Sequence, residues 1–137
     1  MKTFRLKVIS SRRVFFEGDA QSLVLPIADG GLMGFLAGHE NVVAPIEYGE
    51  MKITDADGKE IFAFIGSGFI EFYNNTANVV CISAQRPEEI DVHRAEEALV
   101  RAEEMLRQKH SIFEYHQSQM DLARAMERLK IKNRHDI

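Results

Sequence analysis

The hydrophobic pattern of this chain changes at residues 90–95, Ile-Asp-Val-His-Arg-Ala, and that change restricts the folds it can adopt. Before this point, short apolar runs alternate with turn signals about every ten residues, as in β-sandwiches and barrels. After it, apolar residues recur at the spacing of amphipathic helices. We therefore expect an N-terminal β-sandwich of about eight to ten short strands over residues 1–86. A C-terminal antiparallel two-helix hairpin should follow over residues 87–137.

Alternation predicts the first strands of the sandwich. Residues 4–9 place three apolar side chains on one face and two basic side chains on the other, which indicates a half-buried strand. Residues 14–16 and 21–26 are predicted as two further short strands, because the polar stretch between them includes a glycine.

Two turn signals predict β-hairpins. Asp57-Gly58 lies between two apolar runs, and both positions of a two-residue hairpin loop need a positive φ. Asn74-Asn75 is a second signal of the same kind. Between them, residues 61–65 are apolar on both faces, so we expect this strand to be covered on both sides.

The helical part starts with a cap and breaks once. Asp91 is the expected N-cap of the first helix, its carboxylate accepting from first-turn amides. A break is expected at residues 109–111, and residues 111–114, Ser-Ile-Phe-Glu, fit a capping box that restarts the helix. The predicted apolar stripes are Ala95, Ala98, Leu99, Ala102, Met105 and Leu106 on the first helix, and Tyr115, Gln119, Leu122, Ala123, Met126 and Leu129 on the second.

A hairpin of about forty residues buries too little surface to be firmly stable alone. Its many alanines allow the two backbones to approach closely. The apolar stripes must be completed either by the sandwich or by another protein. If these alternatives are close in free energy, the hairpin has the physical basis of a switch.

Composition excludes several classes of protein. The 137 residues carry a net charge of −4, whereas nucleic-acid-binding proteins usually show a basic excess. The sequence shows no signal peptide and no apolar run of about eighteen residues, so we expect no direct membrane insertion. The single cysteine, Cys81, excludes an internal disulfide and is interpreted as a small core residue.

No group of residues suggests catalysis or metal binding. The glycine pairs lack the spacing of a phosphate-binding loop, and the five histidines lack metal-ligand spacing. Ser67 lies between glycines but not in the pattern of a nucleophile elbow. We therefore predict a protein that is not itself an enzyme.

The arginines of the helices are the candidate binding residues. Arg94 and Arg101 are seven residues apart and share a face of the first helix. Arg124 and Arg128 are four apart on the second, where like charges repel each other. In an antiparallel hairpin that turns near residue 110, Arg94 would cluster with Arg124 and Arg128.

Two interpretations of these arginines remain open. In one, they form a solvated face with ordinary ion pairs, Glu97 with Arg101 and Asp121 with Arg124. In the other, they bind a phosphate or an acidic partner, which would offset the repulsion around Arg128.

The segment 32–36, Leu-Met-Gly-Phe-Leu, also permits two interpretations. It is either the edge of a strand packed into the core or an exposed apolar patch for a partner.

Several motifs together resemble one family. Residues 34–41, Gly-Phe-Leu-Ala-Gly-His-Glu-Asn, resemble the pattern Gly-(Ile/Val)-Leu-Pro-Gly-His-Ala-Pro, and residues 66–69 resemble a Gly-Gly-Gly-Phe hairpin. Residues 122–130 resemble Ala-Leu-x-Arg-Ala-x-x-Arg-Leu. In order, spacing and length, the whole chain resembles the epsilon subunits of F-type (rotary) ATP synthases.

The resemblance implies a role in the central stalk. The sandwich would bind the gamma subunit and the ring of membrane c subunits, coupling proton or sodium flow to ATP synthesis. The hairpin would fold on the sandwich or extend to the catalytic beta and alpha subunits, where it inhibits ATP hydrolysis. Such a subunit performs no chemistry and lies peripherally on the cytoplasmic side of the bacterial cell membrane. The implied partner contacts of the sandwich are Leu32, Met33, Phe35 and His39.

In some bacterial members the folded hairpin binds ATP through the motif Ile/Leu-Asp-x-x-Arg-Ala, which residues 90–95 match. The resemblance then implies ATP as a regulatory ligand, with no cofactor required. Gln85 stands where such members carry Glu. The implied nucleotide-binding residues are Ile90, Asp91, Arg94, Ala95, Arg101, Arg124 and Arg128.

The alternative is a free-standing β-sandwich binding module with a helical arm. This alternative predicts that the chain does not associate with a gamma subunit.

Overall fold

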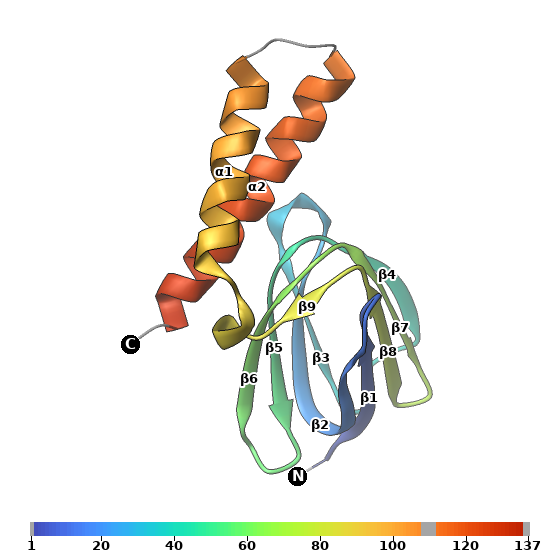
Figure 1. The fold of residues 1–137 in the computed structure, drawn as a ribbon. Coiled ribbons are helices and arrows are strands. Elements are labelled where there is room, and N and C mark those ends of the chain that lie inside the picture. Colours follow the sequence, from blue (N-terminus) through green and yellow to red (C-terminus); the bar gives the residue numbers. More distant parts are fainter. Residues whose placement is uncertain (1, 108–111, 136–137) are drawn as a thin grey trace. The chain divides into compact units, whose positions relative to one another are not determined.

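The computed structural model describes residues 2–107 and 112–135, shown as a ribbon in Figure 1. The chain divides into two compact units, Met1–Arg86 and Pro87–Ile137. The first contains strands and the second contains helices, as the change of pattern predicts.

The N-terminal unit is a β-sandwich built from nine strands of the described residues. Neighbouring strands follow the order β4-β7-β8-β1-β2-β5-β6-β9, and β3 pairs with β2 outside this path. Short 3-10 turns lie at Ala28–Gly30 and, after the last strand, at Pro87–Glu89. The strands are β1 (Phe4–Ile9), β2 (Val14–Pro26), β3 (Leu32–Leu36), β4 (Val42–Ile46), β5 (Gly49–Asp55), β6 (Glu60–Ile65), β7 (Gly68–Tyr73), β8 (Thr76–Cys81) and β9 (Ala84–Gln85).

Strand β2 joins the two layers of the sandwich. Its first half pairs with β1, and its second half pairs with β3 and β5, with a register shift between Ala20 and Ser22. The prediction of two separate strands here was wrong, because a single strand of 13 residues spans both. Glu17 and Asp19 do not interrupt it, since both point outward and lie within 3.9 Å of the guanidinium of Arg5 on β1.

The core confirms the predicted alternation. Phe4, Leu6 and Val8 are buried, and so are both faces of most of β6. Aromatic rings pack at the centre, where the ring of Phe72 lies 5.4 Å from that of Phe4 and 5.8 Å from that of Phe35.

Cys81 belongs to the same core, as predicted. Its side chain is buried in the cluster and its thiol contacts the carbonyl oxygen of Ile9 at 3.5 Å. Burial raises the pKa of the Cys81 thiol to about 11, so the thiol stays protonated at neutral pH.

Both predicted hairpins are present, and one of the two turns differs from the expectation. In the β5–β6 turn only Gly58 has a positive φ, and Asp55 Oδ1 accepts hydrogen bonds from the Asp57 and Lys59 amides at 2.9 Å. Asp57 does not adopt a positive φ, so that part of the prediction was wrong. The second predicted turn, between β7 and β8, is confirmed, because Asn74 and Asn75 have φ values of 48° and 58°.

The C-terminal unit is an antiparallel pair of helices, α1 (Val92–Arg107) and α2 (Ile112–His135), which pack side by side (Figure 1). Asp91 caps α1 as predicted, since its Oδ1 accepts from the Arg94 amide at 3.1 Å. The predicted capping box includes residue 111, which lies outside the described residues, as do the side chains of 112–115. No described helix is long and apolar enough to cross a membrane.

The stripe predicted for α1 is confirmed at its alanines, and the stripe for α2 is displaced. Ala95 and Ala102 are buried on α1, whereas Met105 is 40% exposed. On α2, Ala125 is buried and the predicted Met126 is 56% exposed. The buried described residues of α2 are Ser118, Ala125 and Ile131.

We expect Gly68→Ala to destabilise the sandwich by about 2–3 kcal/mol. A methyl group on Gly68 would overlap the carbonyl oxygen of Val80 and lie 2.7 Å from the Cα atom of Cys81, both backbone atoms of the paired strand. Urea unfolding followed by intrinsic fluorescence or far-UV circular dichroism measures this change.

Gly34→Ala is the matched control, because nothing lies within 4 Å of the position its methyl group would take. Its effect should stay within about 0.5 kcal/mol. If the two substitutions lowered the free energy of unfolding equally, the close approach of β7 and β8 would not be what restricts position 68 to glycine.

Candidate functional site

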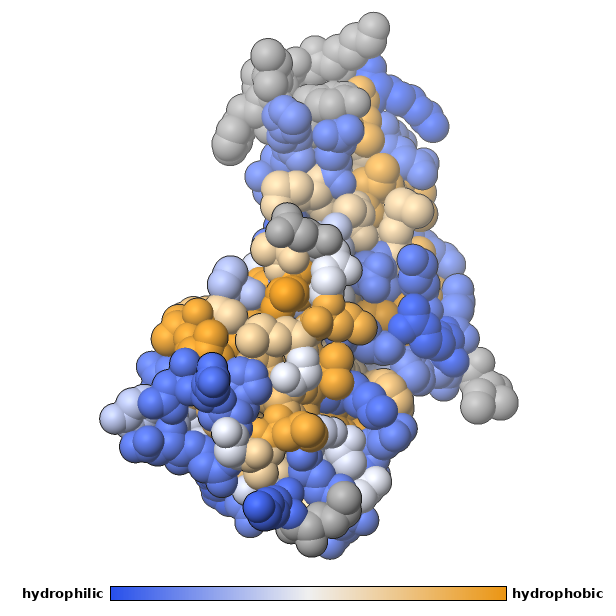
Figure 2. Space-filling model, turned by 180° about the vertical axis from the view of Figure 1, so that it is seen from behind, coloured by the Kyte–Doolittle hydropathy of each residue, from blue (hydrophilic) through white to orange (hydrophobic). Residues whose placement is uncertain are grey.

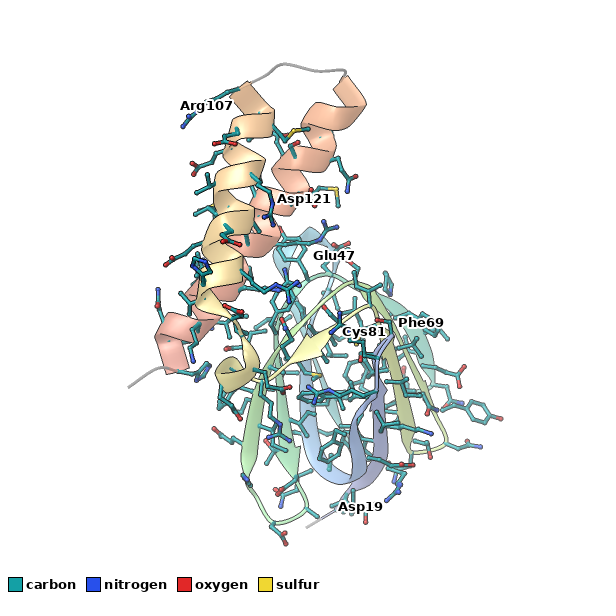
Figure 3. The ribbon with its side chains drawn as sticks, in the orientation of Figure 1. Asp19, Glu47, Phe69, Cys81, Arg107 and Asp121 are labelled. Atoms are coloured by element: carbon teal, nitrogen blue, oxygen red, sulfur yellow. The ribbon has the colours of Figure 1, made fainter. Side chains whose placement is uncertain are left out.

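A groove of about 470 Å³ runs between α1 and α2. Its volume falls within the range of about 300–1,000 Å³ typical of small-molecule sites. Asp121 of α2, labelled in Figure 3, is one of its lining residues. The full lining is Ala98, Arg101, Ala102 and Met105 from α1, with Gln117, Ser118, Asp121, Arg124, Ala125 and Arg128 from α2.

Helical spacing explains why these side chains share the groove. Ala98 lies four residues before Ala102 on one face of α1, and Ser118 lies seven before Ala125 on α2. These short side chains leave space between the helices, while longer side chains at neighbouring positions line the groove.

The groove carries three arginine charges against one carboxylate, from Arg101, Arg124, Arg128 and Asp121. Arg124 Nη1 donates to Asp121 Oδ1 at 3.2 Å, so this predicted ion pair is confirmed. Burial, and secondly the nearby charge of Arg124, lower the pKa of Arg128. The positive charges are therefore close enough to repel each other in a partly desolvated setting.

Arg124 also has a buried donor that nothing in the described structure satisfies. Its Nε atom is buried, and no described acceptor lies within hydrogen-bond distance. An unsatisfied buried donor on a charged group is costly. An anionic oxygen entering the groove is the kind of acceptor that would satisfy it.

The groove contains only part of the predicted nucleotide site. Arg101, Arg124 and Arg128 line it, whereas Ile90, Asp91, Arg94 and Ala95 do not. Ile90 and Ala95 are buried and Arg94 is exposed.

Arg94 is not among the residues that line the groove, and Arg101 lines it together with Arg124 and Arg128. Glu97, predicted to pair with Arg101, instead pairs with His93 Nε2 at 2.9 Å.

The segment 32–36 of the sandwich combines both interpretations of its sequence. It forms β3, whose residues alternate, so that Leu32 and Leu36 are 68% and 64% exposed. Met33 is partly buried against the core. Phe35 is fully buried, which corrects the prediction that it contacts a partner. A strand presents alternate side chains to opposite faces, so Leu36 replaces Phe35 as the exposed residue.

His39 packs against the core from the loop after β3. Its ring lies 4.7 Å from that of Phe35 and 5.3 Å from that of Phe72. Its Nδ1 atom lies 2.7 Å from the carbonyl oxygen of Glu40. This position supports the loop more directly than it offers a contact to a partner.

An exposed apolar row on the sandwich was missed by the sequence analysis. Pro45 pairs with Phe69, Phe69 pairs with Val80, and Val80 pairs with Ile9, so these residues form one row across four strands. Phe69 is 45% and Val80 39% exposed. Figure 2 shows that apolar side chains also gather on the face of this unit seen there. The alternation of buried Ile70 with exposed Phe69 was the available signal.

Comparisons with known proteins agree with these two units. Residues 3–87 match the family model of the ATP synthase delta/epsilon chain β-sandwich domain, and residues 88–133 match the model of its long α-helix domain. The chain is 41% identical to the ATP synthase epsilon chain of Ruminiclostridium cellulolyticum, with 98% of each chain covered. It is 38% identical to the epsilon chain of Caldanaerobacter subterraneus subsp. tengcongensis, covering 98% of this chain and 96% of that one.

Solved structures show the same fold at lower identity. A chain in the structure of Euglena gracilis mitochondrial ATP synthase (OSCP/F1/c-ring) matches with a TM-score of 0.78 and 21% identity. That match covers 91% of this chain and 78% of the other. A chain of the central stalk and c-ring of Tetrahymena thermophila mitochondrial ATP synthase matches with a TM-score of 0.67 and 8% identity, covering 96% and 97%.

We expect Asp91→Ala to destabilise the start of α1 by about 1 kcal/mol, because it removes the acceptor of the Arg94 amide. Hydrogen exchange of the first-turn amides of α1 measures the loss as faster exchange. Asp91→Asn should largely preserve protection, since Asn also caps helices.

Glu96→Ala, an exposed substitution within α1, is the control and should leave exchange nearly unchanged. Faster exchange in this control, but not in Asp91→Ala, would contradict the assigned role of the cap.

Proposed function

Since the chain belongs to the ATP synthase epsilon-chain family, we propose that it is a regulatory, non-catalytic subunit of the central stalk of a rotary ATP synthase. In this proposal the sandwich docks on the gamma subunit and the c-subunit ring and helps couple proton or sodium flow to ATP synthesis. The helices regulate the complex by inhibiting ATP hydrolysis. The subunit lies peripherally on the cytoplasmic side of the bacterial cell membrane.

The exposed apolar side chains of the sandwich support a docking role. Leu32 and Leu36 project from β3, and Phe69 and Val80 belong to the apolar row described above. Exposed apolar side chains gathered on a β-surface are typical of interaction sites. Docking would remove their surface from water and supply the hydrophobic contribution to binding.

The observation that carries the regulatory proposal is the groove with three arginines. Arg101, Arg124 and Arg128 line one space whose volume suits a small ligand. Guanidinium groups bind phosphate oxygens through charge-assisted hydrogen bonds, and a triphosphate would offset the repulsion between Arg124 and Arg128. The buried Nε of Arg124 fits the same ligand, because it lacks an acceptor among the described residues. We therefore assign ATP as the regulatory ligand of the hairpin.

ATP binding would couple to the state of the hairpin. The lining residues come from both helices, so a ligand that contacts both stabilises their packed arrangement. A hairpin held in this way would not extend toward the catalytic alpha and beta subunits. High ATP would thus favour the packed hairpin, and low ATP would favour the inhibitory arrangement.

Millimolar ATP should raise the melting temperature of the isolated chain, and Arg128→Ala should abolish that rise. Arg128 lines the groove, and its removal takes away one of the three cations around the phosphates. Differential scanning calorimetry with and without ATP measures both effects.

Lys130→Ala is the matched control, because Lys130 is an exposed cation of the same helix outside the groove lining. The Lys130→Ala variant should show the same ATP-dependent rise in melting temperature as the wild type. Persistence of the full ATP-dependent rise in Arg128→Ala would exclude Arg128 from the site.

Truncation after Pro87 should keep binding to the gamma subunit and relieve inhibition of ATP hydrolysis. The sandwich has its own core, which the truncation leaves intact. Pull-down with gamma measures the first effect, and the ATPase rate of the reconstituted complex measures the second.

Equal inhibition by the truncated and full chains would contradict a regulatory role of the helices. Absence of gamma binding by the full chain would favour the free-standing binding module instead.

A further inference from the structure

We propose that Asp121 acts as a built-in competitor for the phosphate groups of the ligand and lowers the affinity of the groove. This inference rests on the proposed function of the groove as a nucleotide site. It identifies an affinity-determining residue that belongs neither to the arginine set nor to the motif at residues 90–95.

The carboxylate of Asp121 lies beside Arg124 in the groove. Asp121 lines the same groove as Arg124 and lies one helical turn before it on α2. The distance from Arg124 Nη1 to Asp121 Oδ1 is 3.2 Å, so the carboxylate already occupies one donor of this arginine. A phosphate oxygen that approaches Arg124 therefore meets an existing acceptor of the same charge sign.

Asp121 affects the electrostatics of the ligand-free hairpin. Arg124 and Arg128 are four residues apart on α2, and burial together with the nearby charge of Arg124 lowers the pKa of Arg128. Asp121 offsets part of the repulsion between these two arginines, because it places a negative charge beside Arg124. The carboxylate therefore stabilises the ligand-free groove.

Asp121 would also act on the groove when a triphosphate occupies it. A triphosphate carries several negative charges into the groove, where Asp121 would repel them at short range. The side chain of Arg124 is 21% exposed and that of Asp121 is 56% exposed, so water screens the charges of this pair in part. Asp121 thus stabilises the free groove and destabilises the occupied one, and both effects weaken binding.

These opposite effects give the residue a signature that a purely structural role lacks. Removing the charge of Asp121 should lower the melting temperature of the free chain slightly and should tighten nucleotide binding. Replacing a residue that only supports the helix would lower both the melting temperature and the affinity for nucleotide. Through this difference Asp121 sets the ATP concentration at which the hairpin responds.

The test compares D121N with the wild-type full chain by isothermal titration calorimetry with Mg-ATP and, separately, with inorganic tripolyphosphate. We expect D121N to bind both ligands about three- to tenfold more tightly, consistent with one short-range charge repulsion in a partly screened site. The difference in affinity between D121N and the wild type should become smaller when salt is raised from about 0.05 M to about 0.5 M, because salt screens the repulsion between Asp121 and the phosphates. D121A serves as a second variant should D121N fold poorly.

E104Q is the matched control. Glu104 is exposed on α1 outside the groove lining, and the substitution changes the net charge by the same amount. Its affinity should equal that of the wild type. A gain in E104Q as large as in D121N would overturn the inference, because the effect would then be one of net charge.

The remaining outcomes separate the inference from the function on which it rests. If the wild type binds Mg-ATP and D121N binds it equally or more weakly, the inference is overturned and the nucleotide site stands. Weaker binding only in Mg²⁺ would identify Asp121 as a partner of the metal ion. If neither chain binds millimolar ATP, the nucleotide site and the inference are both overturned.

Discussion

The close approach of α1 and α2 is the constraint on which the helical unit depends. Ala95 and Ala102 on α1, and Ser118 and Ala125 on α2, are buried, and all four side chains are short. Short side chains let two helical backbones approach, but they bury little apolar surface. Three of them, Ala102, Ser118 and Ala125, line the groove, and the short side chains limit the stability of the hairpin around it. Larger buried side chains would fill the space and strengthen the packing, at the cost of the groove between the helices.

The charged side chains that line the groove make the stability of the packed helices depend on electrostatics. The long side chains of the groove are mostly cationic, and burial together with the nearby charge of Arg124 disfavours the charged form of Arg128. Burial prevents water from screening these charges fully, so the free energy of the hairpin depends on which anion lies among them. Asp121 supplies one such anion from within the chain. In the proposed function, an external polyphosphate would compete with it, so the chain's own carboxylate and the ligand would act on the same arginines.

The sequence predicted the two-unit architecture, the hairpins and the helix cap, because these depend on local pattern. It did not predict that β2 runs unbroken for 13 residues, because the outward pairing of Glu17 and Asp19 with Arg5 is set by strand register. In the site, Arg101, Arg124 and Arg128 were predicted and line the groove, whereas Arg94, which was also predicted, does not line it. Spacing along one helix predicts which residues share a face. The level at which two helices meet depends on packing, and the choice of Ala125 over Met126 as the buried residue depends on it too.

The two units differ in how a ligand can affect them. The sandwich is held by paired strands and a continuous aromatic and aliphatic core, and domains of this kind are typically stable by about 5–15 kcal/mol. A ligand present at about ten times its dissociation constant adds about 1.4 kcal/mol to the state it binds. Such a contribution would change the population of the sandwich's folded state very little. For a hairpin packed through alanines, it is comparable to the whole effect of a helix cap. Under the proposed function, modest nucleotide affinity would therefore be sufficient to control the helices without unfolding the sandwich.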